Sequence, residues 1–89
     1  MTRIFKYPLL VIDEPEVIMP EGAKILCVQT QYDQPVLWAL VDDAKPLKSK
    51  VFRIVGTGRA IDFETEGYVG TFQVLEGGLV FHVFEKKGH

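Results

Sequence analysis

The stretch YVGTFQVLEGGLVFHVF, residues Tyr68–Phe84, decides the fold class. Apolar and polar side chains alternate on both sides of Glu76-Gly77-Gly78, and a period of two is typical of a strand that is half-buried in a sheet. The two glycines permit the backbone angles of a tight turn. The stretch therefore predicts a β-hairpin. Gly70, inside its first strand, predicts a bulge or the close approach of another backbone.

The same period of two runs through most of the chain. It predicts further strands over residues 3–11, 16–19, 24–32, 35–41 and 51–56, separated by turn-forming residues. Pro8 indicates that the first of these is an edge strand or contains a bulge. We expect an all-β fold, a small antiparallel sandwich or barrel of about seven short strands with little or no helix, in a single domain of residues 1–89. At most one helical turn would fit in residues 60–64.

The segments between the strands differ in kind. Residues 32–35 predict the turn of a hairpin, with Asp33 as the turn former. The strand that follows, residues 35–41, is apolar on both faces, which predicts a central strand covered on both sides. Residues 42–50 are expected to be a polar loop. Residues 56–67 form a connection that is long for so small a domain.

Composition excludes several classes of protein. Ten basic and twelve acidic side chains give a net charge of −2, so nucleic-acid binding is not expected. No window approaches eighteen apolar residues, which predicts neither a membrane span nor a signal peptide. The lone Cys27 cannot form an intrachain disulfide, and a cytoplasmic location fits this. A chain this short has a thin core, so we expect a homo-oligomer.

Catalytic and metal-binding patterns are weak. Ser49 is the only serine and has no nucleophile-elbow sequence around it. His82 lies in a strand between Phe81 and Val83, and we expect it to be a hydrogen-bonded structural histidine. Cys27 and His82 would need carboxylates to complete a zinc site. We therefore expect no enzyme activity, no cofactor and no metal; an enzyme built on a carboxylate pair is the disfavoured alternative.

The sequence GTGRAI, which begins at Gly56, is the best candidate for a binding site. Glycines around a threonine allow successive N–H groups to point into one concavity that binds an anion, and Arg53 and Arg59 flank it. Aromatic side chains such as Trp38, Tyr68 and Phe63 would offer stacking surface. In the alternative interpretation the glycines only let the strand turn. The candidate ligand-binding residues are Arg53, Gly56, Thr57, Gly58, Arg59, Trp38 and Tyr68.

Charge is distributed unevenly around this loop. Five basic residues and no acid occur from Lys45 to Arg59, whereas four acids and no base occur from Asp62 to Glu76. Solvated faces of neighbouring strands would explain this distribution. A localised anion site is the alternative explanation.

Several motifs together carry a family resemblance. The chain contains MPEGAKILCVQTQYDQPVLWALVD (residues 19–42), RIVGTG (53–58), YVGTFQ (68–73) and GGLVFHVFE (77–85). In this order they resemble a family of small proteins of unassigned function encoded by bacteriophages and prophages. The family pattern tends to have Ser at the position of Cys27, which argues against an essential thiol. The resemblance implies a phage accessory protein that acts in the host cytoplasm, by sequestering a nucleotide-derived immune signal or by binding a host defence protein.

Two functional hypotheses follow. In the first, the chain is a non-enzymatic binding protein whose Gly56–Arg59 loop takes up an anionic, nucleotide-like small molecule. In the alternative, it is a protein–protein interaction module that inhibits or recruits a host protein through a strand edge or an aromatic patch. The first predicts a response to small anions, and the second predicts a stable complex with a protein.

Overall fold

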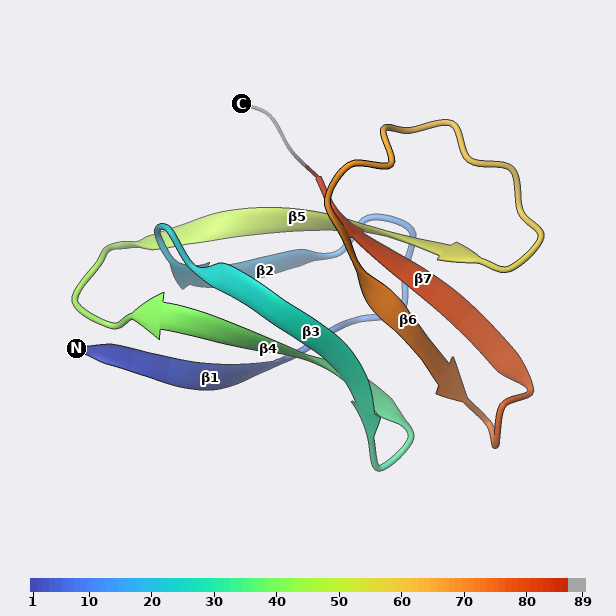
Figure 1. Cartoon of the computed structure of the whole chain (residues 1–89), viewed down its shortest axis with the longest axis horizontal. Helices are drawn as coiled ribbons and strands as arrows, with labels where there is room; N and C mark the ends of the chain where they lie inside the picture. The colour runs from blue at the N-terminus through green and yellow to red at the C-terminus, as the bar shows by residue number, and fades with distance from the viewer. Residues whose placement is uncertain (87–89) are drawn as a thin grey trace.

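The computed structural model describes residues 1–86 of the chain, and all of their regular structure is β-strand (Figure 1). The strands are β1 (Thr2–Pro8), β2 (Glu16–Pro20), β3 (Lys24–Gln31), β4 (Gln34–Asp42), β5 (Leu47–Gly56), β6 (Tyr68–Val74) and β7 (Leu79–Glu85). The prediction of an all-β fold of about seven short strands is confirmed. No helical turn forms in residues 60–64.

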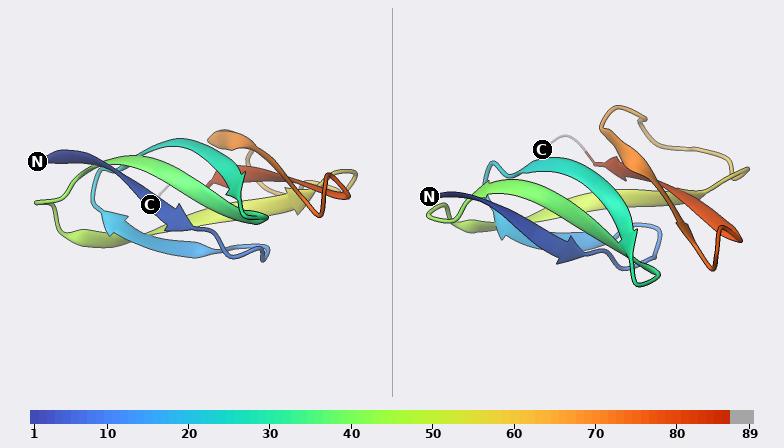
Figure 2. Two further views of the ribbon diagram at one scale, coloured as in Figure 1. Left: turned by 90° about the horizontal axis from the view of Figure 1, so that it is seen from below. Right: turned by 60° about the horizontal axis from the view of Figure 1, so that its bottom comes forward.

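The strands form two antiparallel sheets. One sheet has the order β1-β4-β3, and the other has the order β2-β5-β7-β6. Figure 2 shows β3 and β4 in one layer and β2 and β5 in the other. The core lies between the layers, and its most completely buried side chains include Leu37 of β4, Phe52 of β5 and Val83 of β7. The architecture is a two-layer sandwich, in which each sheet buries its inward-facing positions.

The strand β4 is central, and its two faces are buried to different extents. It pairs with β1 on one side and with β3 on the other, as predicted for a central strand. Leu37, Ala39 and Val41 face the second sheet and are buried. On the opposite face Val36 is also buried, at 5% exposure, whereas Leu40 is 37% exposed. The prediction that β4 is covered on both sides therefore holds at Val36 and is wrong at Leu40. With two layers in the described part of the chain, the outer face of each sheet has no third layer over it.

The hairpin between β3 and β4 turns at two residues, Tyr32 and Asp33. Their φ angles are 54° and 62°, and two consecutive positive values are typical of a type I′ turn. The carboxylate of Asp33 also accepts a hydrogen bond of 2.9 Å from the backbone N–H of Leu75. Asp33 thus fulfils the predicted turn role and ties this hairpin to the turn between β6 and β7.

The polar segment of residues 42–50 is only partly a loop. Its last four residues, 47–50, belong to β5 and pair with β2, which corrects the predicted loop. Lys48 forms an ion pair of 2.8 Å with Glu21, and Ser49 donates a hydrogen bond of 3.0 Å to Glu16. Polar side chains that face solvent and have partners across the ladder are compatible with a strand, which is why composition alone was misleading here.

The first strand is shorter than predicted, because the chain leaves the sheet after Leu9. Residues 9–11 are not part of β1. The Leu9 N–H still donates to the Pro35 carbonyl, at 3.0 Å, but the Ile12 N–H turns back to the Leu10 carbonyl at 2.9 Å. The prediction that Pro8 marks an edge strand is confirmed, since β1 is an outer strand of its sheet.

Gly70 occupies both of the environments predicted for it. The pairing of β6 with β7 shifts register between Tyr68 and Gly70, which is a bulge. A methyl group at position 70 would lie 2.9 Å from Cγ1 of Val28, a buried side chain of β3. The absence of a side chain at this position lets β6 pack closely against β3.

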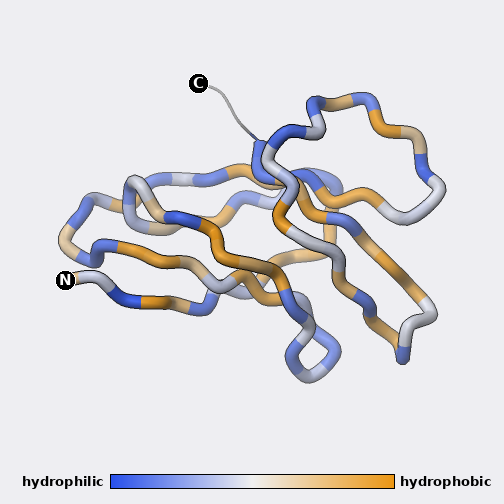
Figure 3. The backbone as a smooth tube through the Cα atoms, in the orientation of Figure 1, coloured by the Kyte–Doolittle hydropathy of each residue, from blue (hydrophilic) through white to orange (hydrophobic). Residues whose placement is uncertain are grey.

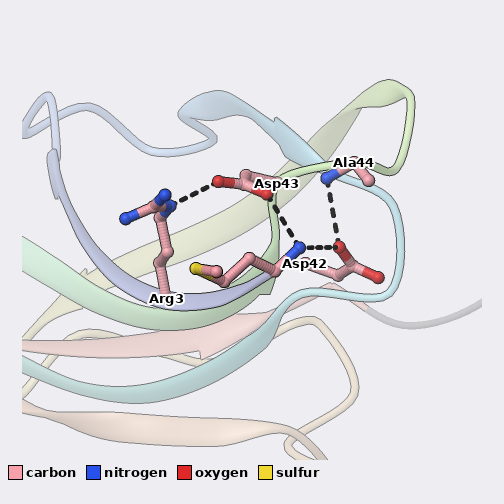
Figure 4. A network of polar contacts seen from close by, with 5 residues as sticks. Arg3, Asp42, Asp43 and Ala44 are labelled. Carbon is pink, nitrogen blue, oxygen red and sulfur yellow. Dashed lines mark hydrogen bonds and ion pairs between the residues drawn. The ribbon is translucent and has the colours of Figure 1, made fainter.

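The start of β1 is held by a cluster of charges at the turn between β4 and β5 (Figure 4). Arg3 pairs with Asp43, and the Met1 amine lies 3.2 Å from Asp42 and 3.1 Å from Asp43. The hydrogen bond from Arg3 is the main cause that lowers the pKa of Asp43, and the backbone N–H of Ala44 is the main cause that lowers the pKa of Asp42. The two aspartates raise the pKa of the Met1 amine.

These pKa shifts predict how stability depends on pH. A carboxyl group whose pKa is lower in the folded state stabilises the fold above its unfolded pKa of about 3.9, and that contribution is lost as the pH falls. Asp43→Asn should therefore destabilise the protein at pH 6, and the difference from wild type should shrink between about pH 4 and pH 2. Urea unfolding of both proteins across this range is the measurement. A difference that stays constant down to pH 2 would contradict the proposed role of Asp43.

Candidate functional site

The main pocket of the described chain lies at the end of β5 and has a volume of about 570 Å³. Its walls come from residues 11–13, from the second half of β5 with Phe81 of β7, and from residues 59–63. This volume lies within the range of about 300–1,000 Å³ of small-molecule sites. Gly56 and Arg59, the two ends of the loop that the sequence singled out, line this pocket.

The path of the chain explains why a pocket forms there. The Ile54 N–H donates a hydrogen bond of 3.0 Å to the Asp13 carbonyl, so residues 11–13 run beside β5 before β2 begins at Glu16. On the other side, the connection of residues 57–67 arches away from the end of β5 (Figure 1). The space between these two segments is the pocket.

The loop Gly56–Arg59 is a hydrogen-bonded β-turn. The Arg59 N–H donates to the Gly56 carbonyl at 3.2 Å, and Gly58 has a φ of +90°, which a type II turn requires at its third position. The Thr57 N–H donates to the Val80 carbonyl at 3.2 Å. Thr57 and Gly58 were predicted to orient an anion with their N–H groups, but the Thr57 N–H already has a backbone acceptor, so the predicted concavity does not form as expected.

Arg53 enters the pocket from β5 with several partners. Its guanidinium lies 3.6 Å from Glu14 and 3.5 Å from Asp62, and its Cζ atom lies 4.4 Å from the centre of the Phe63 ring. Its Nε is a buried donor with no hydrogen-bond partner within residues 1–86. Arg53 thus holds the connection of residues 57–67 to β5 and retains one unused N–H donor.

Arg59 lines the same pocket and is exposed. Within residues 1–86 it forms no ion pair. Its aliphatic stem lies near Gly56, where a methyl group would be 3.8 Å from the Arg59 Cγ. Arg59 is therefore the cation of this pocket that is available to an incoming anion.

Most of the basic run Lys45–Arg59 is neutralised in space. Antiparallel pairing brings acids from distant parts of the chain to it: Lys48 meets Glu21, and Lys50 meets Glu85 at 2.7 Å. Asp13 and Asp62 also line the pocket, and Asp62 lies 3.5 Å from the Arg53 guanidinium. The charge asymmetry seen along the sequence thus becomes a mixed-charge pocket rather than a broad basic surface.

Two of the predicted aromatic residues lie outside this pocket. Trp38 is on β4, in the other sheet, and its indole N–H donates to the Gln29 side chain at 3.1 Å. Tyr68 lines a second pocket of about 440 Å³ with Lys50 and Glu85. Its ring lies 5.4 Å from that of Phe84, which in turn lies 5.3 Å from Phe63. Of the candidate residues, the structure brings together Arg53, Gly56 and Arg59 in the main pocket, with Thr57 and Gly58 in the adjoining turn.

His82 has a hydrogen-bond partner at each ring nitrogen. Its Nε2 lies 2.8 Å from the hydroxyl of Thr57, and its Nδ1 lies 2.9 Å from the hydroxyl of Thr71. The Thr71 hydroxyl also contacts the Tyr68 hydroxyl, at 2.5 Å. The prediction of a hydrogen-bonded structural histidine is confirmed, and a chain of polar contacts runs from Tyr68 on β6 through His82 on β7 to Thr57, which directly follows β5.

Sequence reasoning missed several wall residues of the pocket. Phe81 was assigned only to an alternating strand, although its ring stacks on Phe72 at 5.4 Å and also reaches the pocket. Val11, Ile12 and Asp13 were missed because they meet β5 only through the hydrogen bond to Ile54. No signal in the sequence marks them, since Val11 was itself expected to belong to the first strand.

Within residues 1–86 no three His, Cys, Asp or Glu side chains gather as metal ligands would. The same part of the chain contains no helix of the length and hydropathy that crossing a bilayer requires. No curated protein and no solved structure matches the chain. Residues 1–89 match the family model described as "Domain of unknown function (DUF7352)". The chain therefore belongs to the DUF7352 family.

Proposed function

We propose that the protein is a non-enzymatic binding protein that takes up an anionic, nucleotide-like small molecule in the pocket at the end of β5. The observation that carries the proposal is the position of Arg59, which lines a pocket of about 570 Å³ and has no ion-pair partner within residues 1–86. A guanidinium presents a planar fork of N–H donors that suits the oxygens of a phosphate or carboxylate.

The remaining walls narrow the kind of ligand. Val11, Ile12 and Phe81 give the pocket an apolar side, which suits a flat ring rather than a bare inorganic anion. Asp13 and Asp62 are acceptors, so the ligand should offer N–H or O–H donors away from its anionic group. A nucleotide has an anionic group, a ring with apolar faces and such donors.

The turn and Arg53 have supporting parts in this proposal. The type II turn fixes the backbone from which Arg59 projects, because its hydrogen bond joins Arg59 to Gly56. Arg53 holds Asp62 and the ring of Phe63 beside the pocket. Removal of Arg53 would therefore disturb the wall as well as the charge.

The biological setting of this proposal comes from the resemblance to phage-encoded proteins. A small protein that binds a nucleotide without transforming it would act by sequestration. We therefore propose an accessory role in the cytoplasm of a bacterial host, where such a protein would lower the concentration of a nucleotide signal.

The experiment is a thermal-shift screen against inorganic phosphate and linear and cyclic nucleotides, followed by calorimetry. A ligand present at a hundred times its Kd stabilises a protein by about 2.7 kcal/mol, which should raise the Tm by roughly 10 °C or more. Arg59→Ala should lose at least about tenfold in affinity, because a charge-assisted hydrogen bond contributes about 1.5–3 kcal/mol. Arg59→Lys should recover part of the loss, since it restores the charge without the fork.

Lys45→Ala is the matched control. It removes a positive charge from the same basic run but lies outside the pocket. Its affinity for the ligand should equal that of the wild type. A panel with no thermal shift, or equal losses in Arg59→Ala and Lys45→Ala, would contradict the proposal.

A second function is favoured by one observation, the exposed aliphatic segment beside the pocket. Leu10, Val11 and Ile12 are consecutive and are 67%, 41% and 49% exposed. Exposed apolar patches often mark protein interaction sites. In this alternative a host protein docks here and is inhibited or recruited. The host protein should co-purify with the wild type and not with Val11→Asp. Nucleotides should cause no thermal shift in the wild type or in Val11→Asp.

A further inference from the structure

We propose that the protein forms a homodimer in which the β1 strands of two copies pair antiparallel, with Ile4 of one copy opposite Ile4 of the other. The three-stranded sheet β1-β4-β3 would then continue across the two-fold axis into the same sheet of the second copy. Three features of the molecule support this pairing: the free edge of β1, the direction of its backbone groups, and the side chains that the pairing would bring together.

Within residues 1–86 four strands lie at sheet edges, and β1 is the longer of the two, β1 and β2, whose outer edges face no other strand. The edges of β3 and β6 face each other: the Thr30 hydroxyl donates to the Gln73 carbonyl at 2.8 Å, and Val28 packs over Gly70. The strand β2 has five residues, follows Pro15 and ends at Pro20. Short strands and prolines, which have no N–H to donate, disfavour pairing with another chain at a sheet edge. The strand β1 runs from Thr2 to Pro8, and its only proline is its last residue.

The hydrogen bonds at the two ends of the β1–β4 ladder reveal which way its backbone groups point. The Asp43 N–H donates to the Met1 carbonyl, and the Leu9 N–H donates to the Pro35 carbonyl. Met1 and Leu9 therefore belong to hydrogen-bonded pairs, in the same register that pairs Phe5 with Ala39. Every second pair of an antiparallel ladder is hydrogen-bonded, so the odd-numbered residues of β1 bond to β4. The N–H and C=O groups of Thr2, Ile4 and Lys6 therefore point to the free edge.

These groups are self-complementary in one register. With Ile4 opposite Ile4, Thr2 lies opposite Lys6, and each of these pairs exchanges both N–H···O bonds. Three neighbouring registers are less favourable. Two of them place Arg3 opposite Arg3 or Lys6 opposite Lys6, and like charges directly opposite each other are unfavourable. The third places Phe5 opposite Phe5 and therefore Thr2 opposite Pro8, which has no N–H to donate.

The side chains of β1 suit this register on both faces. Along β1 an apolar stretch lies between polar positions (Figure 3). On the outer face Ile4, which is 59% exposed, lies beside Leu40, so two such pairs would form one continuous apolar strip across the two-fold axis. On the other face Phe5 would lie opposite Arg3 of the second copy, where a guanidinium can pack against a ring. The pairing covers exposed apolar side chains and leaves no charge opposite a like charge.

The experiment introduces a positive or a negative charge at position 4 and measures the mass of each variant by sedimentation velocity. The wild type should sediment with about twice the 10.1 kDa mass of the chain. Ile4→Arg and Ile4→Glu should each sediment as monomers, with dissociation constants raised at least about tenfold, because like charges would then face each other across the axis. An equimolar mixture of the two variants should recover the dimer. This recovery requires that position 4 lies opposite position 4.

Ile18→Arg is the matched control, because Ile18 is also 59% exposed on an edge strand, β2. It should leave the dimer unchanged. Circular dichroism and thermal unfolding establish that each variant is folded. A wild type that remains monomeric at high concentration would overturn the proposal, as would a dimer that survives Ile4→Arg or a mixture of the two position-4 variants that stays monomeric.

Discussion

A Leu37→Ala variant is expected to lose about 2–5 kcal/mol of unfolding free energy. Leu37 is fully buried on β4, where its side chain faces the second sheet. Its truncation removes apolar contacts and leaves a cavity, because the two sheets can relax only partly. Small domains are stable by about 5–15 kcal/mol, so this is a large share of the total. Urea unfolding, with a Tm drop of roughly 10 °C or more as a second readout, measures it.

Leu40→Ala is the matched control for this prediction. The change in side-chain volume is the same and the strand is the same, but Leu40 lies on the outer face and is 37% exposed. Its loss should be about 1 kcal/mol or less when measured at low protein concentration. Equal losses at positions 37 and 40 would contradict the unequal burial of these two side chains.

Gly70→Ala is expected to destabilise the protein by about 1–3 kcal/mol. The added methyl group would lie 2.9 Å from Cγ1 of Val28, which is closer than carbon atoms pack. Val28 is β-branched and buried, so it cannot rotate away freely. Either β6 or β3 must move, and the contact between the two sheets loosens. Chemical unfolding of the purified variant measures the loss.

Two further variants separate this clash from a general effect of replacing glycine. Gly56→Ala should be close to neutral, since its nearest contact would be an ordinary 3.7 Å to the Phe81 ring. Val28→Ala should cost less in the Gly70→Ala background than alone, because it removes the clashing methyl group. Additive losses from Val28→Ala and Gly70→Ala would show that the two positions do not meet as described.

The fold was largely predictable, because strands leave a local signal. The period of two in residues 68–84 gives β6 and β7 directly, and the glycines mark their turn. The errors arose where the signal depends on distant partners. Residues 47–50 were assigned to a loop by composition, but β2 and its acids make them a strand. The apolar outer face of β4 predicted a covering layer. The sequence shows that a face is apolar, but it does not show which part of the chain packs against that face.

The site was less predictable than the fold. The sequence located Arg53, Gly56 and Arg59 correctly in one region, because they lie close together in the chain. The sequence predicted Trp38 as a stacking residue because its side chain is aromatic, but Trp38 belongs to the other sheet. It also could not show that Arg53 already has acidic partners, since Glu14 reaches it only through the packing of residues before β2.

The most direct test of the proposed function is an NMR titration of ¹⁵N-labelled protein with the strongest nucleotide from the thermal-shift screen. The main pocket and the Tyr68 pocket are separate sites, so the amides that shift distinguish them. The account predicts saturable shifts at Gly56, Arg59 and Phe81, lost in Arg59→Ala and kept in Lys45→Ala. Shifts confined to Lys50, Tyr68 and Glu85, or no saturable shift at any amide, would contradict it.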